Sequence, residues 1–263
     1  MQKKKLPEEE QKKQDALEKS TEPDVPQGVV ITKKADFSAW KPKTELGKKV
    51  KIEEIKNISE IIGKGYKILE EQIVEKLIPN LETDLLSIGQ SKGKFGGGKR
   101  SIWRQTQHKT EDGNKPQFAS LVIVGNRNGY IGMGYGKAKE TMPAREKATR
   151  KAKLNLIMIR RGCGSWECNC NEPHSIPLAV FGKSGSVEII LKPAPKGTGL
   201  CVEKECRKIL ALAGIKDVYS RTWGHTHTKL NMMYACMNAL KTLSELKIIP
   251  ANAKKVGLLE GEQ

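Results

Sequence analysis

Large apolar side chains are scarce in this sequence. Aromatic residues make up 5% of its 263 residues and hydrophobic residues 37%. No apolar run approaches the roughly 20 residues that a membrane-spanning helix needs. The start of the chain runs into Glu8-Glu9-Glu10, where a secretory signal has an apolar segment. We therefore expect neither a membrane protein nor a secreted one. The length is sufficient for a core and suggests two domains.

The six cysteines lack the regular spacing of a disulfide scaffold, which predicts a protein of the reducing cytoplasm. Three of them, Cys163, Cys168 and Cys170, lie close together and are followed by His174. Three thiolates and one imidazole form a common structural zinc set, although C-x4-C-x-C-x3-H is not the usual knuckle spacing. A reduced loop without metal is the alternative, and thiol redox chemistry is a third, so the sequence leaves zinc open. No organic cofactor is expected.

Motifs of nucleotide-using enzymes are incomplete. The glycine cluster 129-GYIGMGYGK-137 has Ile131 where a phosphate-binding loop needs its first glycine, and Ala138 where it needs Ser or Thr. These glycines fit better a close approach of backbone to backbone, or of backbone to RNA. The loop at Thr198 and Gly199 lacks the serines of the phosphate-binding loop in small-molecule kinases. No histidine has an acidic or nucleophilic residue at a sequence spacing typical of a catalytic site. We expect no enzymatic activity.

The net charge of +17 is confined to part of the chain. Residues 1–90 carry 17 Lys/Arg and 17 Asp/Glu, whereas residues 91–161 carry 17 Lys/Arg and 4 Asp/Glu. Like charges at this density repel one another unless a polyanion neutralises them, and nucleic acid is the first candidate. A solvated basic face is the alternative. We predict RNA binding by this basic middle of the chain, with no DNA or membrane partner.

Apolar periodicity and turn residues predict an α+β fold. Helices are expected over 66–78 and from Pro143 to about Arg160, and a three-stranded antiparallel meander precedes the second helix. We divide the chain into a disordered or extended tail (1–40), an N-terminal arm that contains the helix 66–78 (41–100), a β-β-β-α domain (101–161), a Cys-rich connector (162–175), a β-β-α-β-α two-layer domain (176–245) and a terminal tail (246–263).

Two basic elements are candidates for contact with phosphates. The Gly/Lys segment 91–100 has no core residues and fits an arm lying on RNA. In the helix from Pro143, the small residues Ala144, Ala148 and Ala152 suit packing on a sheet, so we expect its cations on the outer face. A basic helix across a sheet suits an RNA duplex or junction.

Five stretches then carry a family resemblance, and they run in order through about half the chain. They are 121-LVIVGNRNGYIGMGYGKAKE-140, 152-AKLNLIMIRRGCGSWEC-168, 173-PHSIP-177, 185-GSVEIILKPAPKGTGL-200 and 211-ALAGIKDVYSRTWGHTHTKLN-231. They closely resemble the universal ribosomal protein five of the small subunit, the S-five family. The N-terminal arm and the Cys-rich loop are similar to the archaeal branch, since bacterial members lack that loop.

The resemblance implies a fold and a function. The β-β-β-α part would be a double-stranded-RNA-binding-like domain, and the second part would share its fold with small-molecule kinases. The protein would be a structural constituent of the small ribosomal subunit. It would bind small-subunit rRNA, touch ribosomal proteins four and eight, lie near the path by which mRNA enters, and contribute to translational accuracy. The loop 109–115 is similar to the family's fidelity-linked loop, although Glu111 and Asp112 stand where the family is usually basic.

The charge pattern and the resemblance together give a set of expected RNA-binding residues. They are Lys99, Arg100, Arg104, Lys109, Lys115, Arg127, Asn128, Lys137, Lys139, Arg145, Lys147, Arg150, Lys151, Arg160, Arg161, Lys196 and Arg221. The alternative function is a free-standing double-stranded RNA-binding regulator, which would need neither the second domain nor the neutral N-terminal third.

Overall fold

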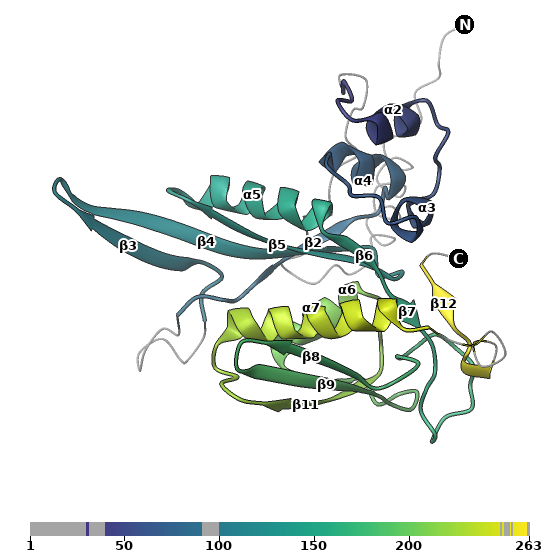
Figure 1. Ribbon diagram of the computed structural model, residues 1–263. Coiled ribbons are helices and arrows are strands. Elements are labelled where there is room, and N and C mark those ends of the chain that lie inside the picture. Colours follow the sequence, from purple (N-terminus) through teal and green to yellow (C-terminus); the bar gives the residue numbers. More distant parts are fainter. Residues whose placement is uncertain are drawn as a thin grey trace, which may run out of the picture.

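A computed structural model describes residues 30–31, 40–90, 100–247, 249, 253 and 255–261. Its main body has four layers: a helix, a sheet, a pair of helices and a second sheet (Figure 1). The paired helices fill the space between the two sheets, and a group of short N-terminal helices sits over one end of the first sheet. The α+β class is as expected.

The first sheet is built around one long strand. Its strands are β1 (Val30–Ile31), β2 (Glu82–Leu86), β3 (Arg104–Thr110), β4 (Gly113–Gly125), β5 (Tyr130–Ala138) and β6 (Leu156–Met158). One half of β4 pairs with β3 and the other half with β2, so β2 and β3 lie end to end along the same edge. The predicted meander is therefore the centre of a six-stranded sheet. Residues 121–124 are buried on both faces, which accounts for their unbroken apolar run.

Helix α5 (Thr141–Leu154) lies directly against β5. A Cβ added to any of three glycines of β5 would come within 2.2 Å of a carbonyl oxygen of the helix. The pairs are Gly132 with Ala152, Gly134 with Ala148, and Gly136 with Ala144. The glycines share one face of the strand and the alanines one face of the helix. The glycine cluster thus serves the approach of backbone to backbone within the protein.

Helix α5 ends at Leu154, earlier than the sequence pattern predicts. The chain returns to the first sheet as β6 and continues into β7 (Arg160–Arg161). Leu156 packs into the core beside α5, whereas Ile157 packs toward the paired helices on the other face. This alternation has the period of a strand, and a helical interpretation of the Leu-Asn-Leu-Ile-Met-Ile run misses it.

The segment 41–100, predicted as an arm with one helix, contains three helices in its described part. They are α2 (Glu45–Lys51), α3 (Ile58–Gly63) and α4 (Glu71–Leu77). The helix predicted over 66–78 is wrong at its start, because residues 66–70 lie outside any helix and Tyr66 and Leu69 are exposed. Glu70 accepts hydrogen bonds from Trp40 Nε1 and from the backbone N–H and hydroxyl of Thr44. These contacts fix the chain ahead of α4 against the start of α2.

The second sheet has the strand order β10-β11-β9-β8. Its elements are β8 (Val180–Ser184), β9 (Val187–Pro193), β10 (Leu200–Cys201), α6 (Lys204–Leu212), β11 (Val218–Trp223) and α7 (Lys229–Glu245). The order matches the predicted β-β-α-β-α, with the short β10 added. Both helices cover one face of this sheet and meet the first sheet with their other side. The expected terminal tail also has structure, since β12 (Leu259–Glu260) pairs with β7.

The two parts of the body meet at the β4–β5 hairpin tip. The backbone N–H of Arg127 donates to the carbonyl of Leu212 over 2.9 Å. A Cβ on Gly214 would lie 2.0 Å from the carbonyl oxygen of Arg127, and φ at Gly214 is +81°. Only glycine combines that backbone angle with that contact. In the described part of the chain, no helix is both long enough and apolar enough to cross a membrane.

Candidate RNA-binding surface and metal centre

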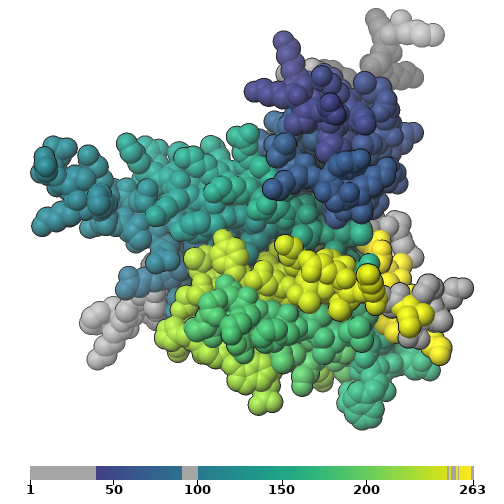
Figure 2. Space-filling model, viewed as in Figure 1, coloured from purple at the N-terminus to yellow at the C-terminus, as the bar shows by residue number. Residues whose placement is uncertain are grey.

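The β3–β4 hairpin projects far from the body of the molecule (Figures 1 and 2). Residues 111–117 are all exposed, as are Arg104 and Lys109 on β3. Lys115 Nζ lies 3.5 Å from the Asp112 carboxylate, and both side chains are mostly exposed. An exposed pair of this kind contributes little free energy, so Lys115 can exchange Asp112 for a phosphate.

A row of cations crosses the first sheet where the hairpin joins the body. Ala119 of β4 pairs with Arg104 on one side and with Lys137 on the other. Neighbouring strands lie about 4.8 Å apart, so Arg104 and Lys137 are two strands, or about 10 Å, from each other. Both are exposed, and so is Lys139 just beyond β5.

Helix α5 carries further cations on the other face of the sheet, because Gly132, Gly134 and Gly136 of β5 face the helix and Lys137 therefore points away from it. Lys147, Arg150 and Lys151 are exposed and Arg145 is half-buried. The ion pairs found among the described residues include none of these four. Lys153 differs, contrary to its expected place on the outer face, because it is buried and paired with Glu75 of α4. We call the exposed set on β3, the end of β5 and α5 the α5 surface; it wraps both faces of the first sheet, with Arg104 and Lys137 on the face opposite to the helix.

Arg127 and Asn128 lie at the opposite end of β4 from the projecting hairpin. Arg127 has φ +58° in the tight β4–β5 turn, and its guanidinium binds the Glu82 carboxylate at 2.8 Å. The backbone N–H of Asn128 donates to Asn126 Oδ1 at 2.8 Å. These two residues therefore do not belong to the α5 surface.

Arg160 and Arg161 are engaged inside the protein, which differs from the expectation that they face RNA. Arg160 is half-buried and pairs with Glu260 of β12 while also reaching the carbonyl of Leu246. Arg161 is 8% exposed, and its guanidinium donates to the carbonyls of Arg127 and Gly261. Burial lowers the pKa of Arg161. Sequence alone shows the charge of these residues but not that β12 folds back over them.

The remaining expected residues are scattered. Lys99 lies outside the described residues, and Arg100 donates to the backbone carbonyls of Gly89 and His227. Lys196 is paired with Glu172 at 2.6 Å. Arg221 is exposed on the outer face of the second sheet, 5.0 Å from the ring centre of Trp223.

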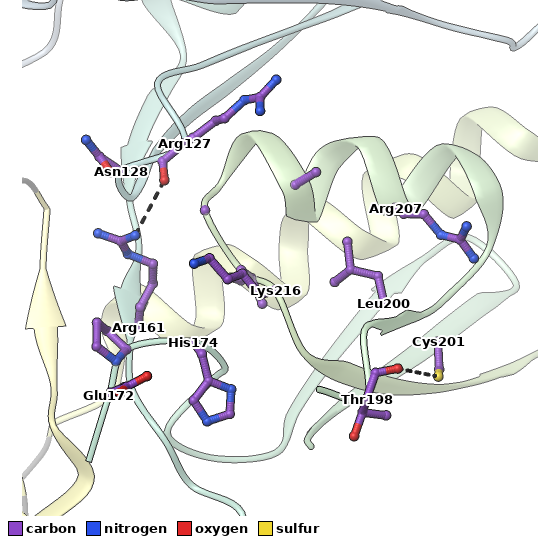
Figure 3. A pocket seen from close by; sticks show the side chains of 14 residues that line it. Arg127, Asn128, Arg161, Glu172, His174, Thr198, Leu200, Cys201, Arg207 and Lys216 are labelled. Atoms are coloured by element: carbon purple, nitrogen blue, oxygen red, sulfur yellow. Dashed lines mark hydrogen bonds between the residues drawn. The ribbon is translucent and has the colours of Figure 1, made fainter. Parts of the chain in front are cut away.

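A cavity of about 1010 Å³ opens between the β4–β5 tip, the Cys-rich connector and α6 (Figure 3). Arg207 and Lys216 line it together with Arg161, and sequence reasoning singled out neither Arg207 nor Lys216. No motif marks these two, because they become neighbours of the connector only through the fold. His174 and Thr198 form part of its wall.

Cys163, Cys168, Cys170 and His174 converge on one point, as the zinc interpretation requires. Their ligand atoms all lie within 4.8 Å of one another, and Cys168 Sγ is 3.8 Å from His174 Nε2. Two hydrogen bonds between Gly162 and Ser175 join the two ends of the connector, and the N–H of Lys216 donates to the carbonyl of His174 at 2.8 Å, which holds the connector beside the second domain.

The electrostatics at His174 and Cys168 favour ligation, whereas those at Cys163 oppose it, because a raised pKa disfavours the thiolate. His174 Nδ1 is 2.8 Å from Asp217 Oδ2, and both side chains are buried. A carboxylate only accepts, so Nδ1 donates and Nε2 keeps its lone pair free toward the thiols. The backbone N–H of Lys196 and then Cys170 lower the pKa of Cys168 to about 6. Desolvation raises the pKa of Cys163 to about 11. The cluster can hold a metal ion of the kind that prefers sulfur and nitrogen.

Comparison with known proteins identifies the family. "Ribosomal protein S5, N-terminal domain" matches residues 102–160 and "Ribosomal protein S5, C-terminal domain" matches residues 182–253. The small ribosomal subunit protein uS5 of Nanoarchaeum equitans is 49% identical over 226 residues, which are 86% of this chain and 97% of that protein. The chain belongs to the uS5 family of small ribosomal subunit proteins.

Other uS5 proteins of archaea are similar over most of their length. That of Pyrobaculum aerophilum is 48% identical over 81% of this chain and 91% of its own. That of Methanococcus maripaludis is 42% identical over 87% of this chain and 93% of its own. The expected S-five resemblance is thus confirmed. As a uS5 protein, the chain is a structural, non-enzymatic component of the small ribosomal subunit, and a free-standing regulator is not supported.

Proposed function

We propose that this uS5 protein binds small-subunit rRNA mainly through the α5 surface and the projecting β3–β4 hairpin. The observation that carries the proposal is the set of exposed cations on α5 and β5 that have no ion-pair partner among the described residues. A helix and a hairpin projecting from one sheet can follow the phosphates of a duplex, which is how shape-based recognition of double-stranded RNA works.

Three lysines test this surface. Lys137→Gln, Lys147→Gln and Lys151→Gln together remove three exposed charges and no packed side chain. Affinity for a small-subunit rRNA fragment should fall, and the slope of log affinity against log salt should decrease by about one for each phosphate that the variant no longer neutralises. Titrations at several salt concentrations measure both.

The matched control removes three exposed charges from the electroneutral N-terminal third: Lys49→Gln, Lys64→Gln and Lys67→Gln. We expect it to bind rRNA with the wild-type salt slope. Equal losses of affinity in the two triple variants would mean that net charge alone governs binding and that the α5 surface has no special role.

The finer roles belong to the same proposal. On the ribosome, in the cytoplasm, the chain would touch ribosomal proteins four and eight, lie near the path by which mRNA enters, and contribute to translational accuracy. The projecting hairpin supports the last role, because a segment anchored by its strands can reach beyond the protein body. Replacing residues 111–112 with Gly-Gly in ribosomes should change misreading of near-cognate codons while subunit assembly stays normal. Unchanged misreading would remove the hairpin tip from this role.

We further propose that Cys163, Cys168, Cys170 and His174 hold a structural zinc ion. Zinc in a tetrahedral Cys3His site binds sulfur at about 2.3 Å and nitrogen at about 2.0 Å, so its ligand atoms lie about 3.5–3.8 Å apart. The spacing of up to 4.8 Å in the cluster needs only small side-chain movements to reach this. Zinc would then join the connector to the second domain, remote from the α5 surface.

Metal analysis of purified protein tests this point. We expect one zinc per chain, loss of zinc in Cys168→Ser with Cys170→Ser, and full retention in Cys201→Ser, which changes an exposed cysteine outside the cluster. Protein purified without chelators that contains no zinc would refute the metal centre but leave the rRNA surface untouched.

A further inference from the structure

The loop Pro193–Gly199 has two backbone N–H groups directed at the carboxylate partner of the Cys3His cluster. Those of Gly197 and Gly199 donate to Asp217 Oδ1 at 3.2 and 2.8 Å. Gly197 and Gly199 have φ of +93° and +73°, so the loop uses two left-handed residues to turn these groups to one side.

Asp217 joins this loop to the cluster. Its Oδ2 accepts a hydrogen bond from His174 Nδ1 at 2.8 Å, while its Oδ1 accepts from the N–H groups of Gly197 and Gly199. One carboxylate oxygen therefore binds the cluster and the other binds the loop. The residue is 4% exposed and is held at the start of β11. A ligating histidine that donates its other nitrogen to a carboxylate is fixed in orientation by it, and the carboxylate is fixed in return.

We infer that the metal centre sets the conformation of loop Pro193–Gly199, and that Asp217 is the positioning residue between them. The inference rests on the proposed zinc site and adds what that site does. Since Thr198 and Leu200 line the cavity of Figure 3 together with His174, the metal would also shape one wall of that cavity. Without metal, His174 can move away from Asp217, and the carboxylate that holds the Gly197 and Gly199 N–H groups loses the partner that fixes it.

Asp217→Asn separates the two interactions of Asp217. An asparagine has one acceptor oxygen, so whichever way its amide points, either His174 or the glycine N–H pair faces an NH2 group. If the NH2 group faces His174, we expect metal affinity, measured by competition with a chelator, to fall about 10- to 100-fold. If it faces the glycine pair, we expect loss of hydrogen-exchange protection at Gly197 and Gly199 even with zinc in excess.

Hydrogen exchange on the full chain, with zinc and after its removal by chelation, is the direct test and needs no variant to fold. Removal should expose the N–H groups of the loop to exchange while α5 stays protected. The matched control is Glu172→Gln, which breaks the exposed ion pair to Lys196 of the same loop without touching Asp217, and it should leave protection unchanged.

The outcomes separate the two proposals. If the protein binds no zinc, the metal centre is wrong and the inference falls with it. If zinc binds but its removal leaves the loop protected, or if Asp217→Asn keeps both wild-type affinity and wild-type protection, only the inference is wrong. A loss of protection in Glu172→Gln as large as that in Asp217→Asn would also overturn it, because the loop would then respond to the breaking of any of its interactions.

Discussion

Gly134→Ala tests whether the close approach of β5 and α5 holds the RNA-binding surface in place. The added Cβ would lie 2.2 Å from the carbonyl oxygen of Ala148 and 2.3 Å from the backbone nitrogen of Ala152. Both are backbone atoms within a hydrogen-bonded helix, so no side chain can rotate away. The helix must retreat by about 1 Å, and a gap of that size costs a quarter to a half of each dispersion interaction along the interface.

We expect this change to lower the free energy of unfolding by about 1–3 kcal/mol, as overpacking of a core does. For a chain of this size, each kcal/mol lowers Tm by about 2–4 °C. Thermal unfolding followed by circular dichroism measures the shift. Because α5 carries Lys147 and Lys151, affinity for rRNA should fall as well, without a change in the number of charges.

Gly63→Ala provides the comparison. Gly63 lies in the last turn of α3 with a right-handed φ and no atom within 4 Å of an added Cβ. Alanine is the better helix former, so this change should be neutral or raise stability by up to about 1 kcal/mol. The reasoning fails if Gly134→Ala unfolds at or above the wild-type temperature, or if both alanines have the same effect.

Two further predictions concern the N-terminal helices. Lys153→Met leaves the Glu75 carboxylate without its buried partner and should lower the free energy of unfolding, measured with denaturant, by about 2–4 kcal/mol. Adding Glu75→Leu to this variant should restore most of the lost stability. Equal destabilisation of the single and double variants would contradict this. Desolvation raises the pKa of Glu70, but hydrogen bonds from Thr44, Lys43 and Trp40 outweigh it, so the pKa lies below its usual value of 4.5. The unfolded state then binds more protons, so the stability that Glu70 contributes is present above pH 4.5 and lost as the pH falls further. The stability difference between wild type and Glu70→Gln should shrink over that acid range, and a difference independent of pH would refute the assignment.

Local patterns predicted the second domain well because its elements are separated by turn residues and each has one apolar face. The first sheet was harder, since β2 and β6 are five and three residues long and join the sheet only through pairing with β4 and β5. Short strands add little periodicity, so their pairing depends on tertiary contacts that a local pattern does not contain. The same limit hid α2 and α3.

The metal cluster and the basic surface show two different limits of sequence reasoning. Four ligands within twelve residues are visible in the sequence because the connector itself brings them together, and the structure confirms that they converge. Asp217 lies 43 residues beyond His174, so its hydrogen bond appears only after β11 is placed beside the connector.

The charge of the basic segment, in turn, indicates that the partner is a polyanion, but it does not show which of the cations face that partner. Arg161 and Lys151 look alike in sequence, but β12 folds back over Arg161 and leaves Lys151 in solvent. Neutralising Lys151 should therefore act on RNA affinity, whereas the effect of changing Arg161 should appear first in stability.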